Sequence, residues 1–181
     1  MSALVEKLHA VDDALTAAKL PHAFGGAIAL AYCTSEPRGT RDIDVNIFVD
    51  QARAREALAS LPAEVAITEQ TIEQALSDGQ TRVWWGDTPV DVFLNNLPLH
   101  HRVAKNIRWR PLGGRDVPVL DCASLALFKA FFNRTKDWAD IEAIAAATPA
   151  DVAEAAGWLA ELDPADASIP RLRTLGQPHG P

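Results

Sequence analysis

The sequence predicts an α/β (α+β) protein, with a mixed β-sheet flanked by helices and a helical region after it. Polar and apolar residues alternate with period two over residues 42–49, which is typical of a strand. Two glycine-containing turns, at 86–89 and 113–114, separate apolar runs and indicate two hairpins. From residue 122 to about 162 the apolar residues follow a helical pattern.

The remaining elements follow from the same periodicities. Apolar residues recur at three- and four-residue intervals over 4–18, which predicts a helix that Pro21 terminates. Further helices are expected at 27–32, 51–60 and 72–77. Strands are expected at 22–24, 42–49, 64–68, 82–85, 90–94, 107–112 and 117–120.

These elements suggest three parts in a chain of 181 residues. We expect an α/β core over 1–120 and a helical subdomain over 121–162. The segment 163–181 is rich in proline and glycine and is expected to be a loosely packed tail.

Composition is that of an ordinary globular protein, with 48% hydrophobic and 23% charged residues. No apolar run approaches the ~18 residues that a membrane span needs, so no membrane partner is expected. The N-terminal residues lack a signal-peptide pattern. Cys33 and Cys122 have no motif spacing and are expected to be reduced thiols, which together favours a cytoplasmic protein.

The charge distribution is uneven. The net charge is −7, which argues against a protein that coats nucleic acid through a global positive field. Residues 100–115, however, contain no acidic side chain. This stretch predicts either a local basic surface or an exposed polar hairpin. Its basic residues are Arg102, Lys105, Arg108, Arg110 and Arg115.

Two carboxylates on the strand at 42–49 carry the first chemical signal. Asp42 and Asp44 are two residues apart, so on an extended strand they project from the same face, roughly 6–7 Å apart. Like charges so close raise one pKa or require a cation. Mg²⁺ would satisfy them because it binds carboxylate oxygens. The alternative is a pair of exposed acids on an edge strand.

Groups suited to phosphate surround this pair in the sequence. Gly25 and Gly26 lie between a short strand and a helix, where glycine lets backbone amides approach a phosphate; the alternative is a tight turn. Arg38, Thr40 and Arg41 precede the acidic strand and could donate to a triphosphate; the alternative is a solvated loop.

Two further charged residues lie in apolar surroundings. Asp91 is flanked by Val90 and Val92, and an unpaired carboxylate there would be costly. It therefore needs a metal shared with the other acids, or a salt bridge to an arginine or lysine. Lys129 lies in an apolar helix and calls for an anion such as a triphosphate, unless it extends to the surface.

The residues after Lys129 allow two interpretations. On one continuous helix Lys129, Lys136 and Asp140 would share a face. Alternatively, Thr135 caps a new helix and Asp137 lies in its first turn, where an acid suits the helix dipole.

These residues together resemble the nucleotidyltransferase signature of the DNA polymerase β superfamily. The matching segments are Gly25-Gly26, Asp42-Ile43-Asp44-Val45 and Val90-Asp91-Val92. The stretch from Arg38 to Asp44 is similar to the Arg-x-Thr-x-Asp-x-Asp pattern of AbiEii/AbiGii and MenT-type nucleotidyltransferases, many of which are toxins of toxin–antitoxin pairs. Their helical motif is resembled by Lys129, Arg134, Lys136, Asp137 and Asp140.

The resemblance implies the nucleotidyltransferase fold and transfer of a nucleotide from an NTP to an acceptor hydroxyl. It implies Mg²⁺ or Mn²⁺ at Asp42, Asp44 and Asp91. Phosphates would be bound by Gly25, Gly26, Arg38, Thr40, Arg41 and Lys129, with Asp137 or Asp140 filling the last catalytic motif.

The toxin resemblance also implies partners. The acceptor would be a tRNA 3′ end, and a cognate antitoxin would exist. Arg102, Lys105, Arg108 and Arg110 would supply the surface that binds the RNA. Two alternatives remain at this point: an antibiotic (lincosamide or aminoglycoside) nucleotidyltransferase, and a non-catalytic nucleotide-binding module.

Overall fold

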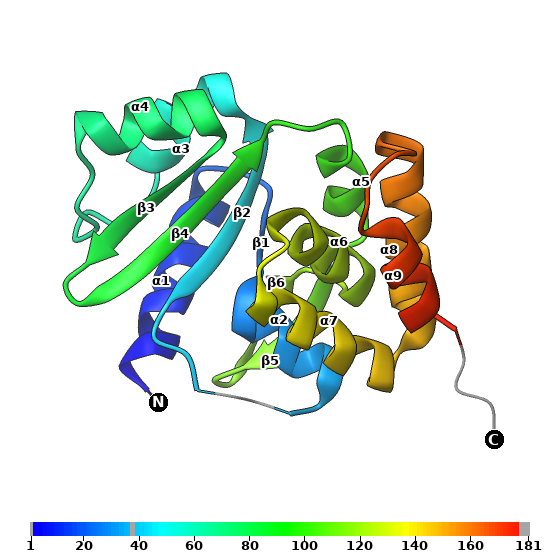
Figure 1. Cartoon of the computed structure of the whole chain (residues 1–181). Helices are drawn as coiled ribbons and strands as arrows, with labels where there is room; N and C mark the ends of the chain where they lie inside the picture. The colour runs from blue at the N-terminus through cyan, green and yellow to red at the C-terminus, as the bar shows by residue number, and fades with distance from the viewer. Residues whose placement is uncertain (1, 37–38, 178–181) are drawn as a thin grey trace. The chain divides into compact units, whose positions relative to one another are not determined.

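In the computed structural model, which describes residues 2–36 and 39–177, the chain divides into two units. The first joins the N-terminal residues up to Gly26 to Gly39–Val119, and the second joins the segment that begins at Ala27 to the residues from Leu120 onward. The helix after Gly25-Gly26, expected in the 1–120 core, thus belongs mainly to the second unit. Figure 1 labels the elements of both.

The first unit contains a six-stranded mixed sheet of order β3-β4-β2-β1-β6-β5. The central strand β2 runs parallel to β4 and antiparallel to β1, while β1 and β6 are parallel. The pairs β3–β4 and β5–β6 are the two predicted hairpins (Figure 1). The strands are β1 His22–Phe24, β2 Ile43–Asp50, β3 Gln80–Trp85, β4 Thr88–Asn95, β5 Arg108–Leu112 and β6 Arg115–Val119.

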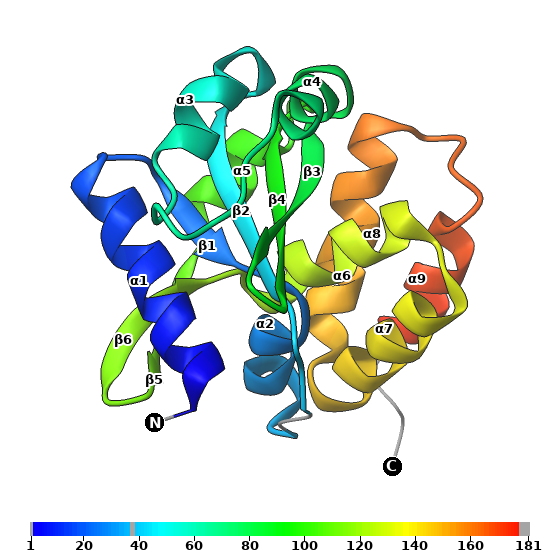
Figure 2. The same cartoon turned by 90° about the vertical axis from the view of Figure 1, so that its left-hand side faces the viewer.

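Helices of the first unit bury their apolar faces against the sheet and one another. In α1, Leu8, Val11 and Leu15 are fully buried at helical spacing. Helices α3 and α4 pack together beside the β3–β4 hairpin (Figure 2). The helical elements are α1 Ala3–Ala17, the 3₁₀ turn η1 Gln51–Arg53, α3 Ala54–Ala59, α4 Glu69–Asp78 and α5 His100–Lys105.

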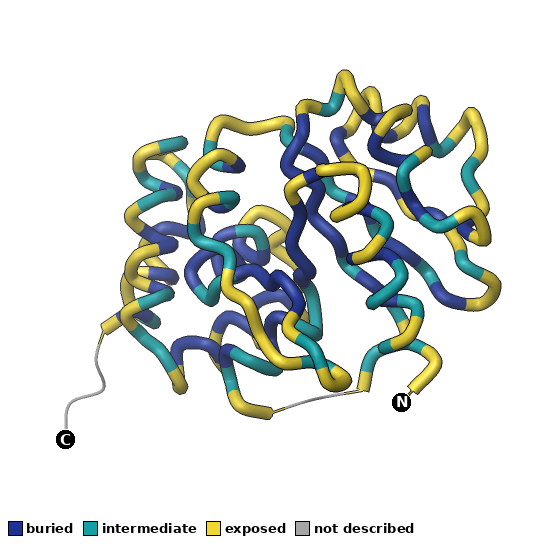
Figure 3. The backbone as a smooth tube through the Cα atoms, turned by 180° about the vertical axis from the view of Figure 1, so that it is seen from behind, coloured by how far each residue is buried: buried dark blue, intermediate teal, exposed yellow. Residues whose placement is uncertain are grey.

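Burial alternates along β4, and this alternation positions the candidate site. Val90, Val92 and Leu94 are buried, whereas Asp91 and Phe93 between them are only half-buried. One face of the hairpin therefore belongs to the core, and the other carries Asp91. Buried backbone runs through the central strands in Figure 3.

The second unit is helical but not continuous. Its helices are α2 Gly26–Thr34, whose first residue belongs to the first unit, α6 Cys122–Phe132, α7 Thr135–Ala147, α8 Pro149–Leu162 and α9 Ile169–Leu175. Asn133 adopts a left-handed conformation (φ 52°) that ends α6. The expectation of a loosely packed tail was wrong for α9, because Ile169 and Leu172 are buried and anchor it.

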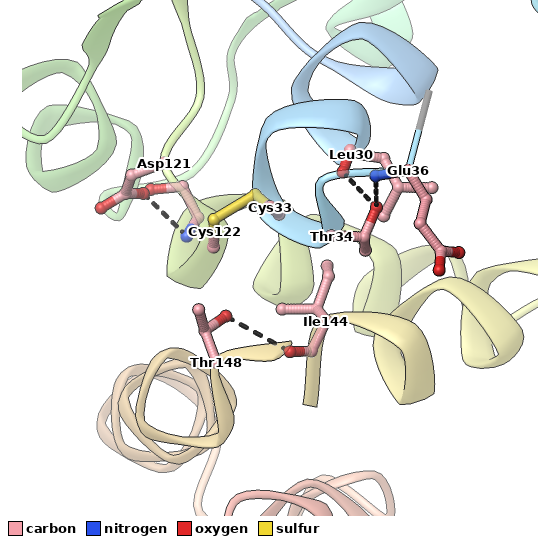
Figure 4. The surroundings of a disulfide bond; sticks show 9 residues. Leu30, Cys33, Thr34, Glu36, Asp121, Cys122, Ile144 and Thr148 are labelled. Atoms are coloured by element: carbon pink, nitrogen blue, oxygen red, sulfur yellow. Dashed lines mark hydrogen bonds between the residues drawn. A yellow bond between two sulfur atoms is a disulfide. The ribbon is translucent and has the colours of Figure 1, made fainter. Parts of the chain in front are cut away.

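The expectation of reduced thiols was also wrong. Cys33 near the end of α2 and Cys122 at the start of α6 form a disulfide within the second unit, and their Cα atoms are 5.5 Å apart (Figure 4). Asp121 caps α6 by accepting a hydrogen bond from the amide of Ser124. The pairing links residues 89 positions apart, so no local spacing could indicate it.

Two smaller differences from the expected elements remain. Residues 64–68 form no strand, and Ala66 makes only an isolated bridge to Trp84. The start of the basic stretch, residues 100–105, is helix α5 rather than part of a hairpin. Among residues 2–36 and 39–177, no helix has the length and apolar character required to cross a membrane.

Candidate active site

Asp44 and Asp91 are directly opposite each other on the neighbouring parallel strands β2 and β4. Arg82 on β3 is in turn directly opposite Asp91. Residues in register on adjacent strands project from the same face, and adjacent strands are about 4.8 Å apart. Arg82, Asp91 and Asp44 therefore form one row across three strands of the first unit.

Arg82 and Asp91 form a bidentate ion pair. Nε of Arg82 donates to Oδ1 of Asp91 and a terminal guanidinium nitrogen donates to Oδ2, both at 2.6 Å. The hydrogen bonds to Asp91 raise the pKa of Arg82; burial opposes this effect, and the charges of Asp91, Asp42 and Asp44 add to it. All three predicted carboxylates thus lie within electrostatic reach of one guanidinium.

The Gly25-Gly26 turn adjoins Asp44 on the side away from Asp91. The amide of Gly25 donates to the backbone carbonyl of Asp44 at 2.9 Å. Gly26 has φ +51°, and a Cβ built on it would lie 1.9 Å from Oδ2 of Asp44. Only glycine allows the backbone this conformation and this approach at low cost.

The loop before β2 orients Asp42. The hydroxyl of Thr40 donates to Oδ1 of Asp42, and the amide of Asp42 approaches the same hydroxyl at 3.3 Å. Arg41 is exposed. Arg38, also expected to bind phosphate, lies outside the described residues.

The chemistry of this donor set suits a hard divalent cation, because all three side chains offer carboxylate oxygens. Asp44 and Asp91 are in register, and Arg82 shows that the row accepts a positive charge. In the described part of the chain, however, no three His, Cys, Asp or Glu side chains converge into a ready-made metal cluster. Both oxygens of Asp91 are turned to Arg82.

Lys129 and the two acids after it form a network inside the second unit. Nζ of Lys129, on a largely buried side chain, donates to Asp140 at 2.6 Å and lies 3.7 Å from Asp137. Burial alone would raise the pKa of Asp137, but the hydrogen bonds and charge of Arg134 and the charge of Lys129 outweigh burial and lower it. The structure therefore supplies protein carboxylates as the anions that face Lys129.

Asp137 also caps α7. It lies in the first turn and accepts a hydrogen bond from the backbone amide of Arg134 at 3.3 Å. The break at Asn133 means that Lys129 and Asp140 are on different helices. The interpretation with a second helix and Asp137 in its first turn is confirmed, although Arg134 rather than Thr135 is the capping residue.

The two units divide the predicted residues between them. Asp42, Asp44, Asp91, Gly25, Gly26, Thr40 and Arg41 belong to the first unit, and Lys129, Asp137 and Asp140 belong to the second. Sequence reasoning left open whether Asp91 pairs with a metal or a basic residue, and it did not single out Arg82. The hairpin pattern held a signal, because a two-residue turn at 86–87 places residue 82 opposite residue 91.

Two exposed tryptophans lie on opposite edge strands of the sheet. Trp84, 47% exposed, is two residues from Arg82 on β3 and so shares its face. Trp109, 59% exposed, lies between the exposed Arg108 and Arg110 on β5. Arg115 does not join that basic surface, because Asp12 and Asp13 hold it.

Comparison with known proteins places the fold. No family model matches the sequence, and no curated protein matches it. Among solved structures, the chain is similar to ANT(2″)-Ia in complex with adenylyl-2″-tobramycin, with a TM-score of 0.58 and 16% identity over 97% of each chain. The solution structure of the antibiotic-resistance factor ANT(2″)-Ia gives a TM-score of 0.57 and 15% identity over 94% of this chain and 89% of that chain.

A third similar structure is an antigenic nucleotidyltransferase-like protein from Paracoccidioides brasiliensis. It has a TM-score of 0.52 and 15% identity over 96% of this chain and 95% of that chain. The chain therefore has the nucleotidyltransferase fold, as the sequence predicted.

Proposed function

We propose that the protein is a metal-dependent nucleotidyltransferase that moves a nucleotide from an NTP to an acceptor hydroxyl. The observation that carries this proposal is the row formed by Asp44 and Asp91, which the Gly25-Gly26 turn adjoins on the side of Asp44. A sheet built only for stability has no need of carboxylates aligned on one face, since like charges repel. The nucleotidyltransferase fold supports the same conclusion.

Each of the three carboxylates, Asp42, Asp44 and Asp91, has a defined task in this proposal. Asp42 and Asp44 hold Mg²⁺ or Mn²⁺, with Thr40 fixing the orientation of Asp42. Asp91 would complete the metal site, orient the acceptor hydroxyl and accept its proton. The metal supplies charge neutralisation on the triphosphate. The phosphate-binding groups are Gly26, Arg38 and Arg41, because the Gly25 amide and the Thr40 hydroxyl already donate to Asp44 and Asp42.

The second unit has a different role. Because Lys129 already faces Asp140 and Asp137, we assign these three residues to holding α6 and α7 together rather than to the leaving pyrophosphate. A buried lysine without its carboxylates would be costly, and this requirement accounts for all three charges.

For the acceptor we favour a small cationic molecule with several hydroxyl groups, of the aminoglycoside type. The chain carries a net charge of −7, which attracts such a molecule. One similar structure holds adenylyl-2″-tobramycin. Trp84 is exposed on the same face of the sheet as Asp91 and Asp44. Its aromatic ring can contact the apolar face of a sugar ring or an ammonium group of the acceptor.

A second candidate acceptor is an RNA 3′ end, as in the AbiEii/AbiGii and MenT-type toxins. The exposed Arg108, Trp109 and Arg110 favour it, because arginines interleaved with an aromatic ring bind single-stranded RNA. Such a protein would have a cognate antitoxin.

The proposal is tested with nucleotide and acceptor separately. Mn²⁺ or Mg²⁺ with the preferred NTP at a hundred times its dissociation constant should add about 2.7 kcal/mol of stability. That stabilisation corresponds to a rise of roughly 5–10 °C in Tm. NTP labelled at the α-phosphate should then label an aminoglycoside, a lincosamide or total tRNA. A Tm shift without transfer would favour a non-catalytic nucleotide-binding module, and no shift with any NTP would refute nucleotide binding.

A further inference from the structure

Arg82 pairs with the carboxylate of Asp91, which the proposed reaction requires to be free. Its guanidinium takes both oxygens of Asp91 at 2.6 Å. Asp42 and Asp44 act on the same guanidinium. A divalent cation bound in this row would lie beside a full positive charge, and like charges repel.

The position of Arg82 allows it to leave Asp91. Arg82 lies on the edge strand β3, and half of its side chain is exposed, whereas 18% of the Asp91 side chain is. The pairing of β3 with β4 is made by the backbone, so the side chain can move without breaking the sheet. Because half of the Arg82 side chain faces solvent, a competing anion such as a phosphate can reach its guanidinium from outside the sheet.

We propose that Arg82 is a displaceable counter-ion of the metal site: it pairs with Asp91 in the metal-free protein and moves to a phosphate of the bound nucleotide when the site is loaded. The proposal rests on the proposed function above. A planar guanidinium matches a phosphate with two parallel hydrogen bonds, as it matches a carboxylate. The nucleotide therefore offers Arg82 an equivalent partner, and the exchange frees Asp91 for the acceptor hydroxyl.

A fixed brace is the opposing interpretation. In that case Arg82 orients Asp91 permanently, and removing it would disorder a metal ligand. The two interpretations predict opposite changes in metal affinity in the absence of nucleotide.

The experiment measures Mn²⁺ binding to the full chain by calorimetry, first without and then with NTP. We expect Arg82→Gln to bind Mn²⁺ alone about tenfold more tightly than the wild type, because the competing charge is gone. The same variant should bind the NTP about tenfold more weakly in the presence of Mn²⁺, because a charge-assisted contact is lost. Arg82→Lys should show smaller changes than Arg82→Gln in both Mn²⁺ and NTP affinity, since lysine retains the positive charge but loses the two parallel hydrogen bonds of the guanidinium.

Arg55→Gln is the matched control. Arg55 forms an equivalent bidentate pair with Glu69 in the first unit, with distances of 2.9 and 2.7 Å. The Arg55→Gln variant should bind Mn²⁺ and NTP as the wild type does. If the wild type binds Mn²⁺ and NTP but Arg82→Gln binds Mn²⁺ equally or more weakly, the displacement of Arg82 is refuted and the proposed function is not. Absence of Mn²⁺ and NTP binding in every variant overturns the proposed function as well.

Discussion

Gly26 and the carboxylate of Asp44 are so close that a Cβ on residue 26 would lie 1.9 Å from Oδ2 of Asp44. Gly26→Ala must therefore displace that side chain, and it must also hold a left-handed φ of +51°. We expect the free energy of unfolding to fall by about 1–3 kcal/mol and transfer to fall with it. Urea unfolding followed by circular dichroism measures the first effect.

Gly157→Ala provides the control for this substitution. Gly157 lies inside α8, and apart from its neighbours in the chain and the adjoining helix backbone, no atom lies within 4 Å of a Cβ built on it. Alanine there should raise stability by up to about 1 kcal/mol. If Gly26→Ala were as well tolerated, the close approach to Asp44 would not constrain the turn.

The second prediction separates catalysis from folding. Asp44→Asn keeps the shape of the side chain but removes a charge that the metal requires, so transfer should fall at least about a hundredfold. The free energy of unfolding should stay within about 1 kcal/mol of the wild type, since repulsion within the row is reduced. Asp87→Asn, in the exposed turn of the β3–β4 hairpin, should retain activity. Full activity of Asp44→Asn would exclude Asp44 from the mechanism.

The sequence predicted the elements of this site better than their partners. Period two along β2 and β4 placed Asp44 and Asp91 because alternation is a local property of a strand, whereas Asp42 lies in the loop just before β2. The partner of Asp91 depends on the register of the β3–β4 hairpin, which the two-residue turn at 86–87 sets and which the sequence interpretation did not use. The anion of Lys129 was harder to predict, because Asp140 comes from a different helix and tertiary packing brings the two together.

The disulfide was missed because it depends on long-range pairing. We expect thiol labelling of the unreduced protein to detect no free cysteine, since Cys33 and Cys122 are bonded. Reduction should lower the free energy of unfolding by about 2–4 kcal/mol, because the closed loop is long. The double variant Cys33→Ser/Cys122→Ser should show the lower stability and no response to dithiothreitol. Two labelled thiols in the native protein would contradict the pairing.

Asp137 should contribute to acid sensitivity. Its pKa is lower in the folded protein than in the unfolded chain, so its ionised form stabilises the fold at pH values above the unfolded pKa of about 3.8. That stabilisation is lost as the pH falls through the lower folded pKa. Asp137→Asn should be less stable than the wild type at pH 7 and lose less stability on acidification. Parallel curves of unfolding free energy against pH for the two proteins would refute this contribution.

The two exposed tryptophans decide between the candidate acceptors. If the acceptor is a small cationic molecule on the β3 edge, Trp84→Ala should raise its KM about tenfold, which equals the loss of one cation–π or stacking contact, while NTP affinity is unchanged. Trp109→Ala, on the opposite edge strand, should then have no effect. If the acceptor is RNA held by β5, the pattern reverses.

Reversing the charge of the basic residues on α5 and β5 tests the nature of the acceptor independently of the tryptophans. The variant that changes Arg102, Lys105, Arg108 and Arg110 to glutamate replaces no residue of β2, β3 or β4, which carry Asp44, Arg82 and Asp91. Arg108 and Arg110 lie on β5, three strands from β2, and Arg102 and Lys105 lie on α5. For a cationic acceptor the added acids should leave transfer unchanged or increase it. For RNA, the loss of four phosphate contacts should weaken binding and flatten its salt dependence by about three to four units of log–log slope. We expect transfer to be unchanged or increased in this variant, and we expect Trp84→Ala rather than Trp109→Ala to raise the KM of the acceptor.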